Sequence, residues 1–236
     1  QDYTFSPTWF DNDILSFQNE YRRSNKNSNF MADLGFVKGY KSPTTKEKNS
    51  ISHFFANYDL NLKLDKFDSS NLFISFEQVS NDTYLKVFNA HITKSELRPD
   101  NLDLLNNQVK LILNKENYNF SSGFHAYENL TINNSSDRYQ YILPYYNFDT
   151  ILEKKYFNGH ISINSSGSNN LKDTNNLKSN IINNINYTTD NYITNFGLSN
   201  NYNISIKNLN SLGKKNSNSN IIGIGRRGGT KNQKGI

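Results

Sequence analysis

The sequence predicts an all-β fold, an antiparallel up-and-down meander of about ten long strands. Two observations predict this fold. In residues 54–64 apolar and polar side chains alternate strictly, and the apolar ones are Phe54, Ala56, Tyr58, Leu60, Leu62 and Leu64. A period of two is typical of a strand with one apolar and one polar face, and it recurs along most of the chain. At about 3.3 Å per residue, such a run is longer than the usual strand of about five or six residues and could cross a bilayer when tilted.

The composition gives the second observation. Only 35% of the 236 residues are hydrophobic, 14% are aromatic, and the mean hydropathy is −0.76. A soluble β-sandwich of this length would need a dense aliphatic core, whereas a barrel wall with lipid outside and water inside needs one apolar residue in two. The strands are therefore interpreted as an open part of a large outer-membrane β-barrel.

The strands can be followed in order. The first clear one carries Leu15, Phe17 and Tyr21, and after a polar turn at 24–27 the next carries Phe30 and Phe36, which predicts a hairpin. Further strands are expected around 54–64, 72–76 with an extension to 88, 109–113, 120–126, 139–148, 157–163, 177–187 and 192–206. Short turns are expected at 65–69, 116–117 and 189–191, and longer loops at 41–49, 93–106 and 165–176. Alternation of short turns and longer loops is typical of outer-membrane barrels.

The charge distribution separates a body from a tail. Of the 26 basic residues, Arg226, Arg227, Lys231 and Lys234 lie in the last 20 positions, which contain no acidic residue, and the other 22 are nearly balanced by the 21 acidic residues. A nearly neutral body argues against a nucleic-acid partner. Residues 1–215 are expected to form the barrel part, and residues 216–236 a disordered or aberrant basic, glycine-rich tail that packs on neither sheet edge.

No enzymatic site is predicted. The histidines at positions 53, 91, 125 and 160 are far apart, no Gly-x-Ser-x-Gly sequence is present, and no pair stands at metal-ligand spacing. The chain has no cysteine, no apolar run long enough for a transmembrane helix and no signal peptide, so its start at Gln1 is expected of a mature form or a fragment. We therefore expect no catalytic residue, no metal and no cofactor.

Three segments resemble, in order, motifs of the LPS-assembly protein LptD family (OstA C-terminal type). Residues 80–88 are similar to its Ser-Asp-x-x-Tyr-Phe strand end, with Ser80, Asp82, Tyr84 and Leu85 and an inserted Asn81. Residues 135–148 resemble its aromatic-rich Leu-Pro-x-Tyr strand, with Arg138, Tyr139, Leu143, Pro144 and Tyr145 or Tyr146. The opening resembles a third motif through Asp2, Thr4, Phe5, Pro7, Leu15, Glu20, Tyr21 and Arg22.

The resemblance implies lipopolysaccharide transport and assembly in the outer membrane of a Gram-negative bacterium. It implies as partners lipopolysaccharide, outer-membrane lipid, an LptE-like lipoprotein plug and an LptA-like periplasmic bridge. The periplasmic jellyroll and the second half of the family's barrel are not represented, so the chain is expected to be a barrel piece. A diffusion porin or other outer-membrane transporter and a soluble β-sandwich adhesin remain alternatives.

The resemblance also implies roles for single residues. Proline removes a backbone donor from a strand ladder and is usual at sheet edges and bulges. Pro7 is the lateral-gate candidate, because it is similar to prolines that weaken the seam through which lipid leaves the family's barrel. Alternatively, Pro7 is a proline at the start of a strand with no gating role. Pro144 is expected at a bulge. From the alternation, we expect the lumen to be faced by Asp59, Asn61 and Lys63, and the lipid to be faced by Leu60, Leu62 and Leu64. Free sheet edges are expected near Pro7 and near Ile206.

Overall fold

The structure is a computed structural model of the chain. It describes residues 1–10, 14–41, 48–92, 95–132, 136–152, 158–172, 176–214 and 220–228. The polar loop predicted at 41–49 lies largely outside the described residues, and so do residues 216–219 and 229–236 of the predicted tail.

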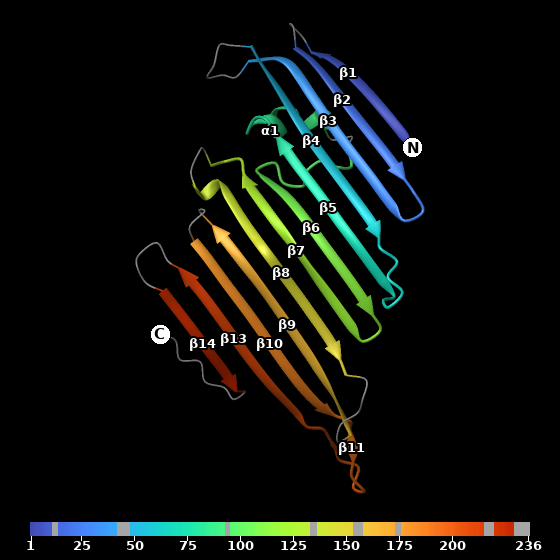
Figure 1. Ribbon diagram of the computed structural model, residues 1–236, viewed down its shortest axis with the longest axis vertical. Coiled ribbons are helices and arrows are strands. Elements are labelled where there is room, and N and C mark those ends of the chain that lie inside the picture. The colour runs from blue at the N-terminus through green and yellow to red at the C-terminus, as the bar shows by residue number, and fades with distance from the viewer. Residues whose placement is uncertain are drawn as a thin grey trace. The chain divides into compact units, whose positions relative to one another are not determined.

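The main sheet follows the order of the chain (Figure 1). Its strands are β1 (Asp2–Phe10), β2 (Ile14–Ser24), β3 (Ser28–Lys41), β4 (Lys48–Asn61), β5 (Ser69–Val79), β6 (Leu104–Lys115), β7 (Tyr118–Asn129), β8 (Tyr139–Ile151), β9 (Gly159–Lys172), β10 (Asn176–Thr189), β13 (Asn203–Lys214) and β14 (Asn220–Gly228). β1–β10 and β13 form an antiparallel meander of eleven strands, and β14 follows β13. Because the order begins at β1 and ends at β14, the sheet is open, which confirms the predicted open meander.

The remaining elements are short. They are α1 (Tyr84–Val87), α2 (Asn89–Ile92), the 3-10 turn η1 (Ser136–Arg138), and a small hairpin of β11 (Tyr192–Ile193) and β12 (Ser199–Asn200). The chain divides into two compact units, which we describe separately. The first contains Gln1–Leu62, Asn71–Lys110 and Phe124–Tyr141, and the second contains Lys63–Ser70, Leu111–Gly123 and Ile142–Ile236.

The first unit has an apolar sheet face built by its registers. Pro7 pairs with Phe17, Phe17 with Phe36, and Leu34 with Phe54, so these side chains share one face. Members of this face that are exposed are Tyr3, Phe5, Trp9, Leu34, Phe36, Phe54 and Phe76. Exposed apolar patches of this kind mark surfaces that contact a partner protein, a ligand or a membrane.

The opposite face of the first unit carries the core. Val37, Ile51 and Phe55 point to this side, and Tyr84, Leu85 and Phe88 of the α1 segment pack against them. Near this core the β3–β4 register shifts between Val37 and Tyr40, where Gly39 has φ +86°, a conformation that favours glycine. The core therefore lies between the sheet and the helical segment.

The second unit has a more polar sheet. β9, β10 and β13 are in continuous register, and Ile163, Ile185 and Ile206 line up across the three strands. Elsewhere the side chains are mainly Asn and Ser, linked across strands: Ser165 Oγ donates to Asn183 Oδ1 at 2.7 Å, and Ser211 Oγ donates to Asn180 Oδ1 at 2.7 Å. Side-chain bonds of this kind complement the backbone ladder.

Several predicted boundaries are wrong. The strand expected to run on to residue 88 ends at Val79, and α1 and α2 follow. The described part of the loop expected at 165–176 is largely strand, since β9 reaches Lys172 and β10 begins at Asn176. The single strand expected at 192–206 is the β11–β12 hairpin followed by β13. Residues 220–228, expected to pack on neither edge, pair as β14 with β13, so the last strand of the order is β14 and not the strand of Ile206.

Candidate functional site

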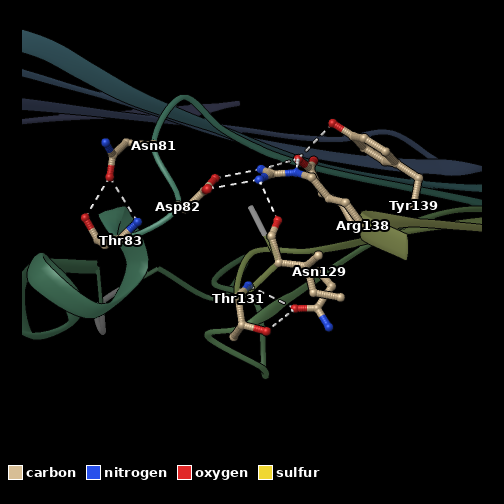
Figure 2. A network of polar contacts seen from close by, with 9 residues as sticks. Asn81, Asp82, Thr83, Asn129, Thr131, Arg138 and Tyr139 are labelled. Carbon is tan, nitrogen blue, oxygen red and sulfur yellow. Dashed lines mark hydrogen bonds and ion pairs between the residues drawn. The ribbon is translucent and has the colours of Figure 1, made fainter. Parts of the chain in front are cut away.

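Asp82, Arg138 and Tyr139 come from two separate family-like motifs, and the first unit brings them together (Figure 2). Asp82 lies in the turn that follows β5, whereas Arg138 ends η1 and Tyr139 begins β8. The two motifs are therefore joined in space by one guanidinium group.

Arg138 binds two carboxylates. Its Nη2 donates to Asp82 Oδ1 at 2.6 Å and its Nη1 to Asp82 Oδ2 at 2.9 Å, which is a bidentate pair. Its Nε and Nη2 donate to Glu128 Oε1 at 2.8 and 2.7 Å. The Tyr139 hydroxyl donates to the same Glu128 oxygen at 3.2 Å, and the guanidinium carbon of Arg138 lies 5.9 Å from the Tyr139 ring centre.

The electrostatics of this cluster favour the charged forms. The Arg138 side chain is only 13% exposed, while that of Asp82 is 36% exposed. Hydrogen bonding from Arg138 lowers the pKa of the Asp82 carboxyl, and the hydrogen bond to Asp82 raises the pKa of Arg138. The cluster is a charge-assisted tether between the turn after β5 and the start of β8.

Both turns beside the tether have the same local design. Asn81 Oδ1 accepts from the Thr83 backbone N at 2.9 Å and from the Thr83 hydroxyl at 2.7 Å. Asn129 Oδ1 makes the same two contacts with Thr131. Asn side chains that bond the backbone two residues on stabilise turns, so the inserted Asn81 ends the extended chain and presents Asp82 to Arg138.

Tyr84 belongs to a second cluster of polar side chains, which is buried. Its hydroxyl lies 2.7 Å from His53 Nδ1, and His53 Nε2 lies 3.3 Å from Asp33 Oδ1. Gln18 Nε2 donates to Asp33 Oδ2 at 2.9 Å. Asp33, His53 and Tyr84 are all buried, and burial, followed by the Asp33 charge, raises the pKa of the Tyr84 hydroxyl.

Gly35 makes room for this group. A Cβ atom at residue 35 would lie 2.2 Å from His53 Cε1 and 2.9 Å from the Tyr84 hydroxyl. Any larger residue would displace the His53 ring, which stacks on Phe55 with ring centres 4.4 Å apart. Glycine is thus needed here for a close approach.

A polar cavity of about 480 Å³ lies on the same side of the first unit. Thr4, Ser6 and Thr8 of β1 line one wall, together with Gln18, Glu20 and Arg22 of β2, and Ala90 and His91 of α2 also line it. Hydroxyl, amide and charged groups predominate, so the cavity suits a hydrated polar ligand rather than an apolar one.

The other predicted residues lie apart from the tether. Pro7 is in β1, the first strand of the sheet order, as expected of an edge proline. The Ser80 N donates to the Ser52 carbonyl at 2.9 Å, and the Ser52 N donates to Ser80 Oγ at 2.6 Å, so Ser80 closes the β4–β5 pairing. Pro144 lies within β8 and belongs to the second unit, and its place at a bulge stays a prediction.

Of the three residues predicted to face the lumen, two lie in β4 and one lies beyond its end. Asp59 and Asn61 end β4 on the face opposite Leu60, in agreement with the alternation. Lys63 is wrong as a strand residue, because β4 ends at Asn61 and Lys63 has φ +51° in the following turn. For the same reason Leu62 and Leu64 lie beyond the strand.

Sequence reasoning missed Glu128, Asp33, His53 and Gly35 as members of these clusters. The alternation placed His53 on a polar face, but not in contact with Tyr84, since the two are 31 residues apart. The available signal was an acidic residue and a glycine two positions apart on the polar side of the alternation, Asp33 and Gly35.

Both clusters consist of ion pairs and hydrogen bonds that join separate segments of the first unit. Within the described residues no group of three or more His, Asp or Glu is arranged to hold a metal ion. Among the described helices, none is both long and apolar enough to cross a membrane. Searches for similar proteins found no matching family model and no matching curated protein.

Proposed function

We propose that this chain is part of the wall of a large outer-membrane β-barrel of the LptD kind and takes part in lipopolysaccharide transport and assembly. The observation that carries the proposal is the two-faced sheet of the first unit. One face exposes aromatic and aliphatic side chains, and the other carries hydroxyl, amide and charged groups around a polar cavity. A wall between lipid and water requires this division.

The size of the apolar face supports a membrane setting. On β3 the apolar positions run from Phe30 to Phe36, and on β4 from Phe54 to Leu60. Six residue steps at about 3.3 Å correspond to roughly 20 Å along the strand. That length approaches the apolar band of about 25 Å that is usual for outer-membrane barrels.

The LptD assignment within this class rests on the resemblance of the motifs. In the structure the tether joins two of the similar segments, since Asp82 of one pairs with Arg138 of the other. In the proposed mechanism the polar face passes the sugar headgroup, while acyl chains leave at the seam near Pro7. An LptE-like lipoprotein and an LptA-like bridge are the partners, and no covalent chemistry or cofactor takes part.

Trp9 allows a direct test of the lipid-facing surface, because it is the one tryptophan of the chain and is 75% exposed. The protein, reconstituted in vesicles that contain brominated phospholipids, should show strong quenching of Trp9 fluorescence. The matched variant combines Trp9→Phe with Thr8→Trp and places the indole on the polar face, where quenching should be weak. Equal quenching of the two would contradict a lipid–water wall.

Transport is tested separately in cells that produce the full gene product. A photo-crosslinking amino acid at Ser6, on the polar face, should capture lipopolysaccharide, and the same group at Lys26, in the turn between β2 and β3, should not. Absence of a lipopolysaccharide adduct at Ser6 while the brominated-lipid result holds would reject the transport role and keep the membrane wall.

A diffusion porin is the second candidate, and β14 favours it. The tail pairs as a strand with β13, as expected if it belongs to the barrel wall. The porin would be favoured if the protein conducts ions in a planar bilayer and if treatments specific for lipopolysaccharide leave that conductance unchanged.

A further inference from the structure

We propose that residues 80–92, here called the cap, form a releasable cover over the polar side of the first unit. The inference rests on the proposed function in one respect, since the cavity that the cap borders would be the polar passage. The cap comprises the turn with Asp82, helix α1 and helix α2. Lys86 Nζ lies 2.5 Å from Asp103 Oδ1, and Ser80 is hydrogen-bonded to Ser52. Two further contacts, at Asp82 and at Tyr84, fix the turn and α1 in the closed position.

The first contact is the tether at Arg138. Arg138 holds Asp82 by two hydrogen bonds, and Glu128 fixes the guanidinium from the other side. In Figure 2 the guanidinium points at the carboxylate of Asp82, directly before α1. Because Asp82 is also partly exposed, water can replace Arg138 as its partner when the cap moves. This contact is therefore strong enough to hold the cap and able to open.

The second contact is the docking of Tyr84 on His53. The two residues meet only because residue 35 has no side chain, as the 2.2 Å approach to His53 shows. Leu85 and Phe88 pack beside them in the core. The cap is thus held by side-chain packing at α1 and by the ion pair of Asp82 with Arg138.

In the closed position the cap covers a buried polar pair. His53 Nε2 lies 3.3 Å from Asp33 Oδ1, and Gln18 donates to the other carboxylate oxygen of Asp33. Both residues are buried beside Tyr84. Opening the cap would expose them to water, which solvates polar groups at a lower free-energy cost than an apolar interior does.

The cap also reaches the polar cavity. Ala90 and His91 of α2 line it opposite the hydroxyl groups of β1, and His91 packs edge-on against Phe10 with ring centres 4.4 Å apart. Movement of the cap therefore changes the size of the cavity. The structure assigns Arg138 and Gly35 the role of positioning residues for this cover.

Cysteine accessibility tests the inference, because the chain has no cysteine. Leu85→Cys places a thiol at a fully buried position of the cap, and Ser75→Cys places one at a buried position of the same unit outside the cap. In detergent micelles, Arg138→Gln and Gly35→Ala should each raise the maleimide labelling rate at position 85 by about tenfold or more. Labelling at position 75 and the β-sheet circular dichroism should stay unchanged.

Arg23→Gln at the exposed end of β2 and Gly213→Ala, where the nearest atom to a new Cβ is 4.0 Å away, are the matched controls and should leave labelling at position 85 slow. Unchanged labelling in both Arg138→Gln and Gly35→Ala would overturn the inference. So would a parallel rise at positions 85 and 75, because the whole first unit would then be opening. Neither readout involves lipid or lipopolysaccharide, so the cap and the proposed function can fail independently.

Discussion

At the scale of single residues, Arg138 is the point at which three side chains of the first unit depend on one another. It is 13% exposed and satisfies two carboxylates, so its loss would leave Asp82 and Glu128 facing each other. Hydrogen bonds to charged groups contribute about 1.5–3 kcal/mol. Arg138→Gln should therefore lower the free energy of unfolding by about 2 kcal/mol, measured by urea titration in micelles with Trp9 fluorescence. Arg23→Gln should change it by less than about 0.5 kcal/mol; an equal effect of both would remove the special role of Arg138.

The Asp82 carboxyl gives the tether a pH dependence. Arg138 lowers its pKa in the folded protein, below the unfolded value of about 3.9. Its stabilising contribution is thus fully present above about pH 4 to 5 and is lost as the pH falls through the lower folded pKa. Asp82→Asn should destabilise the protein at neutral pH and match the wild-type stability in acid. Urea midpoints across this range measure it, with Asp65→Asn in the turn after β4 as the control; a constant difference at every pH would contradict the tether.

Gly35 illustrates a residue whose importance lies in what it lacks. A Cβ at this position meets the His53 ring, and overpacking of this kind costs about 1–3 kcal/mol. Gly35→Ala should destabilise the first unit, whereas Gly213→Ala should be tolerated. Removing the ring by His53→Ala should erase the extra effect of Gly35→Ala, so the double variant tests the contact by non-additivity. Strictly additive free energies would show that the ring is not the obstacle.

At the scale of elements, the sequence predicted strands best where the two faces differ in polarity. The hairpin of β2 and β3 was predicted because Phe17 and Phe36 alternate with polar residues, and the structure confirms it. The α1 segment was missed because a helix of four residues cannot display a 3.6-residue repeat. Asn81 was the local signal, since its side chain bonds Thr83 and ends the extended chain.

Parts of β9 and β10 were predicted as a loop because their side chains differ little in polarity. The run around Ser165 and Asn170 has little polarity contrast, and Ser and Asn are usual in loops. Here the neighbouring strand satisfies the backbone, and cross-strand bonds such as Ser165 to Asn183 use the polar side chains. The candidate clusters were equally out of reach of the sequence, because the tether joins residues 56 positions apart.

Hydrogen exchange can check the β9 assignment. Amides of residues 165–171 should exchange as slowly as those of residues 160–164, because both stretches belong to the same paired strand. Amides of residues 65 and 66, in the turn after β4, should exchange fast and serve as the internal reference. Fast exchange confined to 165–171 would restore the predicted loop.

At the scale of the whole molecule, the open meander and the two-faced first unit imply that the same substitution has opposite consequences on the two faces. Leu62, one of the residues expected to face lipid, lies beyond the end of β4, whereas Phe54 and Asn57 both lie within that strand. Phe54 pairs with Leu34 on the exposed apolar face, whereas Asn57 pairs with Ser75 on the polar one.

Arginine on the lipid side of a barrel costs about 2–4 kcal/mol at the bilayer midplane and little at a water-lined face. Because Phe54 lies at one end of the apolar run of β4, Phe54→Arg should lower the free energy of unfolding from vesicles by up to about 2 kcal/mol, and Asn57→Arg by less than half of that. In detergent micelles, which deform around a charge, the difference should shrink. The micelle measurement therefore controls for the loss of the native side chains, and equal sensitivity at both positions in vesicles would reject the lipid–water wall on which the proposed function depends.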